Sequence, residues 1–196
     1  AQEIGRRFFV PKYDLSMKIF LVVAVLATAI AAGYDWKKGE IPGRFSLGLL
    51  LAAPLAHVIY AVSLGVAEKA AIQAAGVSLL GALVCALVPF LLYRYNAIGG
   101  GDLKFFLALG ALLMPQIGLE ATFLTFVAAA VFAPVKLIYD GKLLQTLKNS
   151  FSIALNAARP KDKQATIEPE ALTWFRLGPC MFVGTAVTAF LEWRSE

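Results

Sequence analysis

Between two long apolar runs the chain reads Asn96-Ala97-Ile98-Gly99-Gly100-Gly101-Asp102-Leu103-Lys104. Three consecutive glycines permit backbone conformations that other residues rarely adopt. An acid follows them directly, and no charge occurs from Phe105 to Met114. Because a carboxylate is costly to place at the mouth of a membrane helix, Asp102 is a candidate functional residue. The alternative is a flexible turn in which Asp102 only caps the next helix.

The composition is that of a membrane protein. Of the 196 residues, 59% are hydrophobic and only 16% are charged, and the mean hydropathy is +0.72. Soluble domains of this length are rarely so apolar. Since a membrane span needs roughly 20 apolar residues, the chain has room for about six helices with short loops. We therefore predict an all-α integral membrane protein, a bundle of about six transmembrane helices, with residues 1–196 forming a single membrane-embedded domain.

Apolar runs separated by polar turns define the predicted spans. They cover residues 16–34, 46–64, 70–93, 103–114, 117–139 and 171–193. The fourth run reaches only about 20 Å at about 1.5 Å per residue, against a hydrocarbon core of about 30 Å. We therefore expect the fourth span to tilt little, or the glycine loop to dip into the membrane. Gly178-Pro179 is expected to loosen the first turns of the last span.

The basic residues predict an orientation. Placing the 34–45 loop in the cytoplasm puts twice as many of the 18 lysines and arginines on that side as on the other. The positive-inside rule favours this orientation, although four basic residues near the N-terminus oppose it. The polar segment 140–170 either contacts anionic lipid headgroups or forms a solvated linker.

Other chemistries find little support. Cys85 and Cys180 lie in separate apolar runs and form no CxxC pair, so neither a zinc site nor a disulfide framework is indicated. The single histidine, His57, lies in an apolar run and is predicted to be a core residue. The basic residues form no continuous patch, so nucleic-acid binding is not expected. We expect no metal and no cofactor.

A second acid lies in the polar loop after the first predicted span. With six spans, the 34–45 and 94–104 loops fall on the same membrane face, and they carry Asp35 and Asp102. Two carboxylates that meet can share a proton, so that one activates water as a base and the other acts as an acid, as in aspartic proteases. The alternative for Asp35 is a solvated loop acid paired with Lys37 or Lys38.

The two acids are predicted to differ. Asp35 follows the C-terminal end of its span, where the helix dipole disfavours a negative charge, whereas Asp102 precedes the N-terminal end of the next one. We hypothesise that Asp102 ionises more readily and that Asp35 keeps the shared proton, although the titration belongs to the pair.

These residues resemble a known family. The run from Gly99 to Lys104 is similar to the Gly-x-Gly-Asp-x-Lys motif of the type IV prepilin peptidases, which are membrane aspartic proteases. Asp35, followed by Ile41-Pro42, is similar to the family's first catalytic Asp and its Ile-Pro-Asn sequence. The resemblance covers essentially the whole chain, and the length agrees with the short members that serve tight-adherence (Flp-type) pili.

The resemblance implies an activity and a location. Asp35 and Asp102 would be the catalytic pair of an aspartic endopeptidase in the bacterial cytoplasmic membrane, with its active site near the cytoplasmic face. The substrate would be a prepilin or pseudopilin, cut between a short basic leader and the hydrophobic helix of the mature subunit. Membrane lipids are the other expected partners, and the sequence does not predict an oligomeric state.

The resemblance also implies supporting residues. Gly99, Gly100, Gly101, Ile41, Pro42 and Lys104 would bind substrate or shape the loops around the two acids. The glycines would let the substrate backbone approach, and Lys104 would either snorkel to the surface as an anchor or help to hold Asp102 ionised. Gly43 stands where the family usually has Asn. The chain lacks the paired CxxC motifs of the long bifunctional members, so zinc is not expected, and N-methyltransferase activity is less expected.

Two other functions remain open. Tyr34-Asp35 and the glycine motif also resemble presenilin-like proteases, but these need more spans and a Pro-Ala-Leu motif that is missing here. Paired acids also occur in proton pathways, so the chain could be a non-catalytic membrane transport or pilus-assembly subunit.

Overall fold

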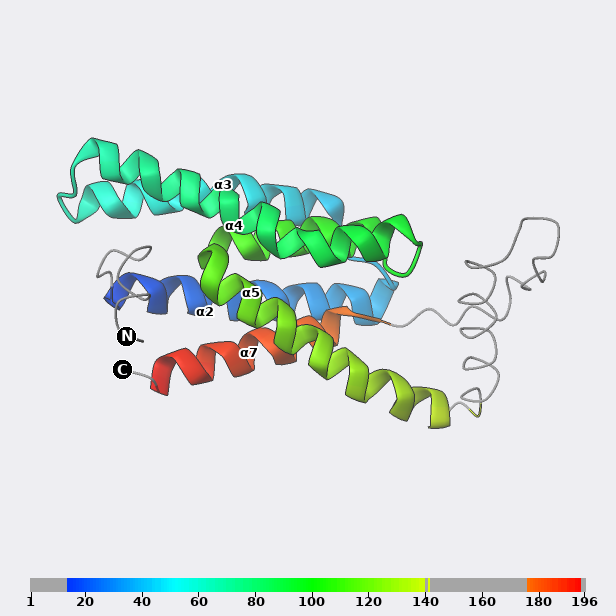
Figure 1. Cartoon of the computed structure of the whole chain (residues 1–196). Coiled ribbons are helices and arrows are strands. Elements are labelled where there is room, and N and C mark those ends of the chain that lie inside the picture. The colour runs from blue at the N-terminus through cyan, green and yellow to red at the C-terminus, as the bar shows by residue number, and fades with distance from the viewer. Residues whose placement is uncertain (1–13, 140, 142–175, 195–196) are drawn as a thin grey trace, which may run out of the picture.

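The chain folds into a bundle of helices (Figure 1). The computed structural model describes residues 14–139, 141 and 176–194, and no strand occurs among them. The helices are α2 (Asp14–Lys38), α3 (Gly43–Ser63), α4 (Glu68–Arg94), α5 (Gly100–Tyr139) and α7 (Gly178–Arg194). The all-α prediction is confirmed for this part of the chain. The 1–13 segment and nearly all of the 140–170 segment lie outside the described residues.

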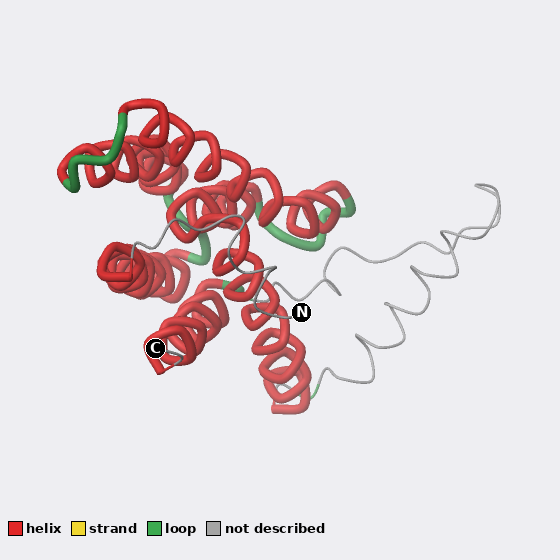
Figure 2. Tube along the Cα trace, turned by 60° about the vertical axis from the view of Figure 1, so that its left-hand side comes forward, coloured by secondary structure: helices red, strands yellow, loops and turns green. Residues whose placement is uncertain are grey.

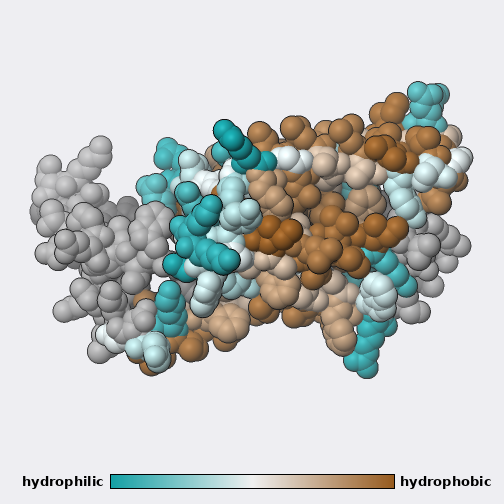
Figure 3. Space-filling view, turned by 180° about the vertical axis from the view of Figure 1, so that it is seen from behind, coloured by the Kyte–Doolittle hydropathy of each residue, from teal (hydrophilic) through white to brown (hydrophobic). Residues whose placement is uncertain are grey.

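Four helical segments are long and apolar enough to cross a membrane. They are Lys18–Lys38, Gly43–Ser63, Glu68–Arg94 and Gly100–Tyr139. The first three coincide with predicted spans, while α7 has 17 residues and covers only the later part of the sixth. The predicted number of about six spans is therefore not established by the described residues. Hydrophobic side chains gather along the middle of the molecule, between hydrophilic ends, as a membrane-embedded bundle requires (Figure 3).

Helix α5 occupies the residues predicted to form two separate spans. A straight helix of its 40 residues would be about 60 Å long, twice the thickness of the hydrocarbon core. However, Met114 has non-helical angles, with φ 60° and ψ 174°. The helix bends sharply in its middle, and its second half runs back toward the end from which the first half came (Figure 1). The bend falls where the sequence predicts a turn at Pro115.

Buried side chains from two other helices satisfy the backbone at this bend. Pro115 has no N–H, so the carbonyl of Ala111 loses its usual helical partner. The Ser78 hydroxyl donates to this carbonyl at 2.7 Å, and Nε2 of His57 donates to the carbonyl of Leu112 at 3.1 Å. The His57 ring also stacks on Phe20, with centroids 3.9 Å apart. His57 is only 5% exposed, which confirms that it is a core residue.

Small residues let the helices approach closely. A β-carbon on Gly81 of α4 would lie 2.3 Å from the carbonyl oxygen of Gly110 in α5. Similarly, a β-carbon on Gly184 of α7 would lie 2.5 Å from the backbone nitrogen of Thr125. Such close contacts are characteristic of helix packing in membranes, where burial of apolar surface does not drive association. They place α4 against the first half of α5 and α7 against its second half. Helix α7 also packs against α2 (Figure 2).

The direction of the helices brings distant segments to one end of the bundle. The C-terminal ends of α2 and α4 lie at the same end as the N-terminal ends of α3, α5 and α7 (Figure 1). Basic residues at this end are Lys37, Lys38, Arg44, Arg94, Lys104, Lys136 and Arg176. Those at the opposite end are Lys18, Lys69 and Arg194. The described residues therefore repeat the charge asymmetry on which the predicted orientation depends.

Candidate active site

The two acids singled out in the sequence lie at the same end of the bundle. Asp35 is in the last turn of α2 and only 4% exposed, while Asp102 is in the first turn of α5 and partly buried. Their charges interact electrostatically. The two residues are separated by two complete helices, α3 and α4, so only the fold brings them together.

The spacing of the glycine motif seats Asp102 at the start of α5. The helix begins at Gly100, which makes Gly99 the N-cap residue and Asp102 the third helical residue. The backbone N–H of Gly99 donates to Oδ2 of Asp102 at 3.2 Å. This is the backward half of a capping box, in which the third residue satisfies the N–H of the N-cap. Asp102 therefore caps its own helix, and its carboxylate lies at the positive end of the helix dipole.

The motif glycines serve close packing rather than unusual backbone angles. None of Gly99, Gly100 and Gly101 has a positive φ, and the last two belong to the first turn of α5. A β-carbon on Gly101 would lie 2.7 Å from the carbonyl oxygen of Ile41, whose side chain is buried. One on Gly100 would meet only the ring of Tyr93, at 3.4 Å. Gly100 and Gly101 therefore begin a helix, and the chain's own backbone occupies the space beside Gly101.

The loop before α3 completes this contact. Pro42 is the N-cap of α3, and its carbonyl accepts hydrogen bonds from the N–H groups of Phe45 and Ser46. Ile41 is thereby held at the start of a helix and pressed against the start of α5. The two motifs that the sequence predicts to act together, around Ile41-Pro42 and around Gly101, are thus in direct contact.

Asp35 has a partner that the sequence did not indicate. The backbone N–H of Gly178, at the start of α7, donates to Oδ2 of Asp35 at 2.8 Å in a buried position. A β-carbon on Gly178 would lie 2.7 Å from the β-carbon of Asp35. The sequence suggested only that Gly178 would loosen a helix. The available signal was a Gly-Pro pair at a helix start, which does not reveal a partner 143 residues away.

This contact removes the helix-dipole reason for the predicted difference between the two acids. Asp35 does lie in the last turn of α2, as expected. However, its carboxylate also lies at the N-terminus of α7, where the dipole favours a negative charge. Each acid accepts a hydrogen bond from a backbone N–H at the start of a helix. The helix-dipole argument therefore no longer assigns the shared proton to Asp35.

The alternative of a solvated, lysine-paired Asp35 does not fit the described residues. Asp35 is buried, and no ion pair joins it to Lys37 or Lys38 in the part of the chain that the structure describes. Nζ of Lys38 instead lies over the ring of Tyr34, 5.5 Å from its centroid.

Lys104 points to the neighbouring loop. Its side chain is exposed, and Nζ lies 3.6 Å from the position that a β-carbon on Gly43 would take. Within the described ranges, Lys104 forms no ion pair with Asp102. Because Gly43 has no side chain, the Lys104 amine can lie next to the backbone of that residue.

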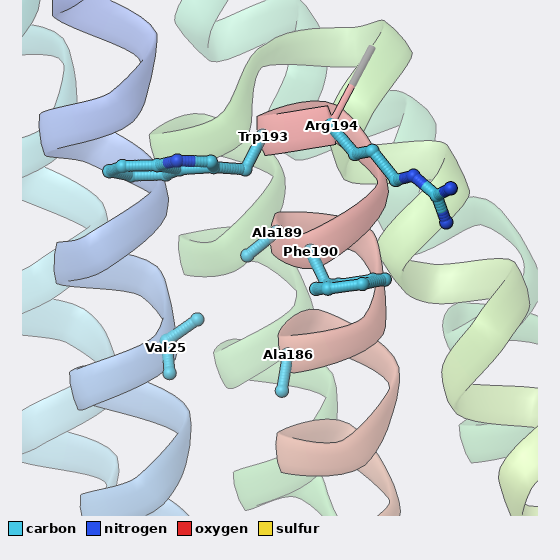
Figure 4. A pocket seen from close by; sticks show the side chains of 6 residues that line it. All are labelled: Val25, Ala186, Ala189, Phe190, Trp193 and Arg194. Atoms are coloured by element: carbon cyan, nitrogen blue, oxygen red, sulfur yellow. The ribbon is translucent and has the colours of Figure 1, made fainter.

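The described residues form no metal-ligand cluster at the site, and an apolar groove that they line lies away from it. The described residues include no group of three or more His, Cys, Asp or Glu side chains that could hold a metal ion. An open apolar groove between α2 and α7 lies elsewhere (Figure 4). Its lining is Val25, Ala186, Ala189, Phe190, Trp193 and Arg194. Val25 precedes Asp35 by ten residues, about 15 Å along the helix, so the groove is remote from the two acids.

Fold and site together define a helical membrane protein with two interacting carboxylates at one end of its bundle. A comparison with protein-family models matches residues 20–134 to the type IV leader peptidase family. The match covers more than half of the chain, and the chain belongs to this family of proteases. No curated protein and no solved structure matched the chain. Asp35 and Asp102 both lie within the matched residues, whereas α7 lies beyond them.

Proposed function

We propose that this protein is an aspartic endopeptidase that removes the leader from prepilin or pseudopilin precursors, with Asp35 and Asp102 as its catalytic pair. The observation that carries the proposal is that these two acids, from separate helices, lie at one end of the bundle, where their charges interact. Membership of the leader peptidase family supports a precursor protein as the substrate.

The proposed chemistry needs one proton between two carboxylates. Like charges at close range disfavour double ionisation, so one acid is ionised and the other is protonated. The ionised acid takes a proton from water, whose oxygen attacks the carbonyl carbon of the scissile peptide bond. The protonated acid gives its proton to the carbonyl oxygen. As the C–N bond breaks, the acid that took the proton from water passes it to the leaving amine. A hydroxyl of the tetrahedral intermediate returns a proton to the other acid, so that the pair regains its starting state.

The position of the acids supports cleavage near a membrane surface. Exposed aromatic side chains at the same end include Trp36, Tyr93 and Tyr95, which suit a membrane–water interface. The basic residues at this end favour the cytoplasmic face. A precursor whose leader is cytoplasmic and whose next segment is a membrane helix would present its cleavage site at this level. Its helix has to unwind there, because a protease acts on an extended peptide.

Cleavage of a precursor tests the proposal. A candidate prepilin is co-expressed with the wild type, Asp35→Asn, Asp102→Asn, or Glu68→Gln, which changes an exposed acid at the opposite end of the bundle. We expect the wild type and Glu68→Gln to cut equally well. Each Asp variant should insert normally but lose activity by about 10²–10⁴-fold, the usual contribution of a general acid or base.

Two results would contradict the proposal. An Asp variant that cuts at the wild-type rate is structural at that position, and the pair is then not the catalytic machinery. If the wild type cuts none of the pilin-like precursors tried, a membrane transport or pilus-assembly role takes precedence.

A further inference from the structure

The end of α2 and the start of α7 cap each other. The N–H of Gly178 donates to Oδ2 of Asp35 at 2.8 Å. In the other direction, the guanidinium of Arg176 donates to the carbonyl of Trp36 and lies over the Trp36 ring, 5.9 Å from its centroid. Helix ends leave backbone N–H and C=O groups without partners. Here each helix end supplies a missing partner of the other. Asp35 in the last turn of α2 accepts from the N–H of Gly178, and Arg176, two residues before α7, donates to a carbonyl of α2.

The hydrogen bond to Asp35 is of a strong kind. A bond between a backbone N–H and a carboxylate is charge-assisted and stronger than one between neutral groups. Both partners are buried, so water does not compete for them. With Oδ2 held by Gly178, Oδ1 is the oxygen left to face a proton or a water molecule. The contact therefore sets the orientation of the whole carboxylate.

No side chain fits at position 178. A β-carbon there would lie 2.7 Å from the β-carbon of Asp35, 2.9 Å from its Oδ2 and 3.2 Å from the α-carbon of Ala32. The start of α7 has little freedom to retreat, because Leu177, Cys180 and Met181 are buried in the core beside it. A methyl group at position 178 therefore displaces the carboxylate.

We propose that Gly178 is a positioning residue for Asp35. Its N–H fixes one carboxylate oxygen, and its lack of a side chain lets the carboxylate lie beside Asp102. Arg176 secures the same junction from the other side. This role rests on the proposed function of Asp35 in catalysis. It also gives α7, which lies beyond the residues of the family match, a direct part in the site.

Kinetics of the purified full-length chain on a prepilin, measured across pH, test this role. In Gly178→Ala we expect kcat to fall on the order of a hundredfold, since a misplacement of about 1 Å has effects of that size. KM should stay within about twofold of the wild type, because the substrate is not touched. The pH profile of kcat should also change shape, because a displaced Asp35 carboxylate alters the electrostatic surroundings of Asp102.

Two matched variants separate positioning from crowding. Gly184→Ala is equally tight within α7, but it meets Thr125 and not Asp35. It should lower thermal stability while kcat and the pH profile of the folded enzyme stay unchanged. Residue Gly33 lies two residues before Asp35 in open space, so Gly33→Ala should leave kcat and its pH profile unchanged. The proposal would be overturned if Gly178→Ala kept the kcat and the pH profile of the wild type. It would also be overturned if Gly184→Ala showed the fall in kcat and the changed pH profile expected of Gly178→Ala.

If Gly178→Ala folds poorly, a double variant tests whether the clash with Asp35 is the cause. Asp35→Gly removes both of the Asp35 atoms that the new methyl group would meet, so Asp35→Gly/Gly178→Ala should restore folded protein in the membrane. Failure to restore it would overturn the proposal. Wild type and Asp35→Asn are measured alongside. If the wild type does not cut, the proposed function fails and the positioning role falls with it. If Asp35→Asn is inactive but Gly178→Ala cuts like the wild type, the positioning role alone fails.

Discussion

The carbonyl oxygen of Ile41 lies so close to Gly101 that a β-carbon on the glycine would be 2.7 Å from it. This contact joins the loop before α3 to the first turn of α5, next to Asp102. Backbone cannot yield in the way that the end of a flexible side chain can. The spacing of the glycine motif therefore combines two requirements, a glycine that admits the neighbouring loop and, one residue later, an acid that caps the helix.

Gly101→Ala should sharply reduce precursor cleavage. The methyl group has to push Ile41 away or tilt the start of α5, and either movement shifts Asp102 relative to Asp35. We expect a loss of about tenfold to a hundredfold in kcat/KM, measured on a prepilin in membranes. Gly100→Ala is the control, because its methyl group meets only the Tyr93 ring at 3.4 Å. Equal losses in the two variants would show that the Ile41 contact is not the reason.

Arg176→Ala should reduce cleavage less than Gly178→Ala does. It removes the donor to the Trp36 carbonyl and the stacking on the Trp36 ring, but it leaves the bond to Asp35 in place. Since exposed interactions of this type contribute about 0.5–1 kcal/mol, we expect a decrease of only severalfold in kcat. The control is Arg94→Ala, which removes another exposed basic side chain at the same end. This variant should cut at the wild-type rate. A larger decrease of kcat in Arg176→Ala than in Gly178→Ala would contradict the prediction that Gly178 matters more to Asp35 than Arg176 does.

Ser78→Ala should destabilise the protein without a direct effect on the acids. It leaves the buried carbonyl of Ala111 without a partner at the bend of α5, and an unsatisfied buried group costs about 1–3 kcal/mol. The measurement is thermal unfolding in detergent, which should occur at a lower temperature than in the wild type. Ser63→Ala is the control, because its hydroxyl bonds only to the exposed carbonyl of its own helix. Unfolding of Ser78→Ala at the wild-type temperature would show that another group satisfies the bend.

Tyr95→Cys and Lys69→Cys should label from opposite sides of the membrane. Both positions are exposed, and they lie at opposite ends of α4. The distribution of basic residues predicts that position 95 reacts with an impermeant thiol reagent from the cytoplasm and position 69 from the other side. The wild type should stay unlabelled, because both of its cysteines, Cys85 and Cys180, are buried. Labelling of position 95 from outside the cytoplasm would reverse the orientation.

The sequence alone was enough to predict three of the described helices closely and to single out the two acids. Long apolar runs predicted α2, α3 and α4 to within a few residues of their ends, because each span must satisfy its own backbone polar groups within one helix. The motifs around Asp35 and Asp102 led to the family that the chain was then found to belong to. These features depend on residues near one another in the chain, so a local pattern is sufficient to reveal them.

Only the tertiary structure decided how the acids are held. Gly178 and Asp35 are 143 residues apart, and neither residue carries a local sign of the other. The same is true of Ser78 and His57, which satisfy the bend in α5 from two different helices, and of Ile41 against Gly101. Each of these contacts joins backbone of one helix end or bend to another part of the chain. Their geometry follows from how the helices pack, which no periodicity within a single helix encodes.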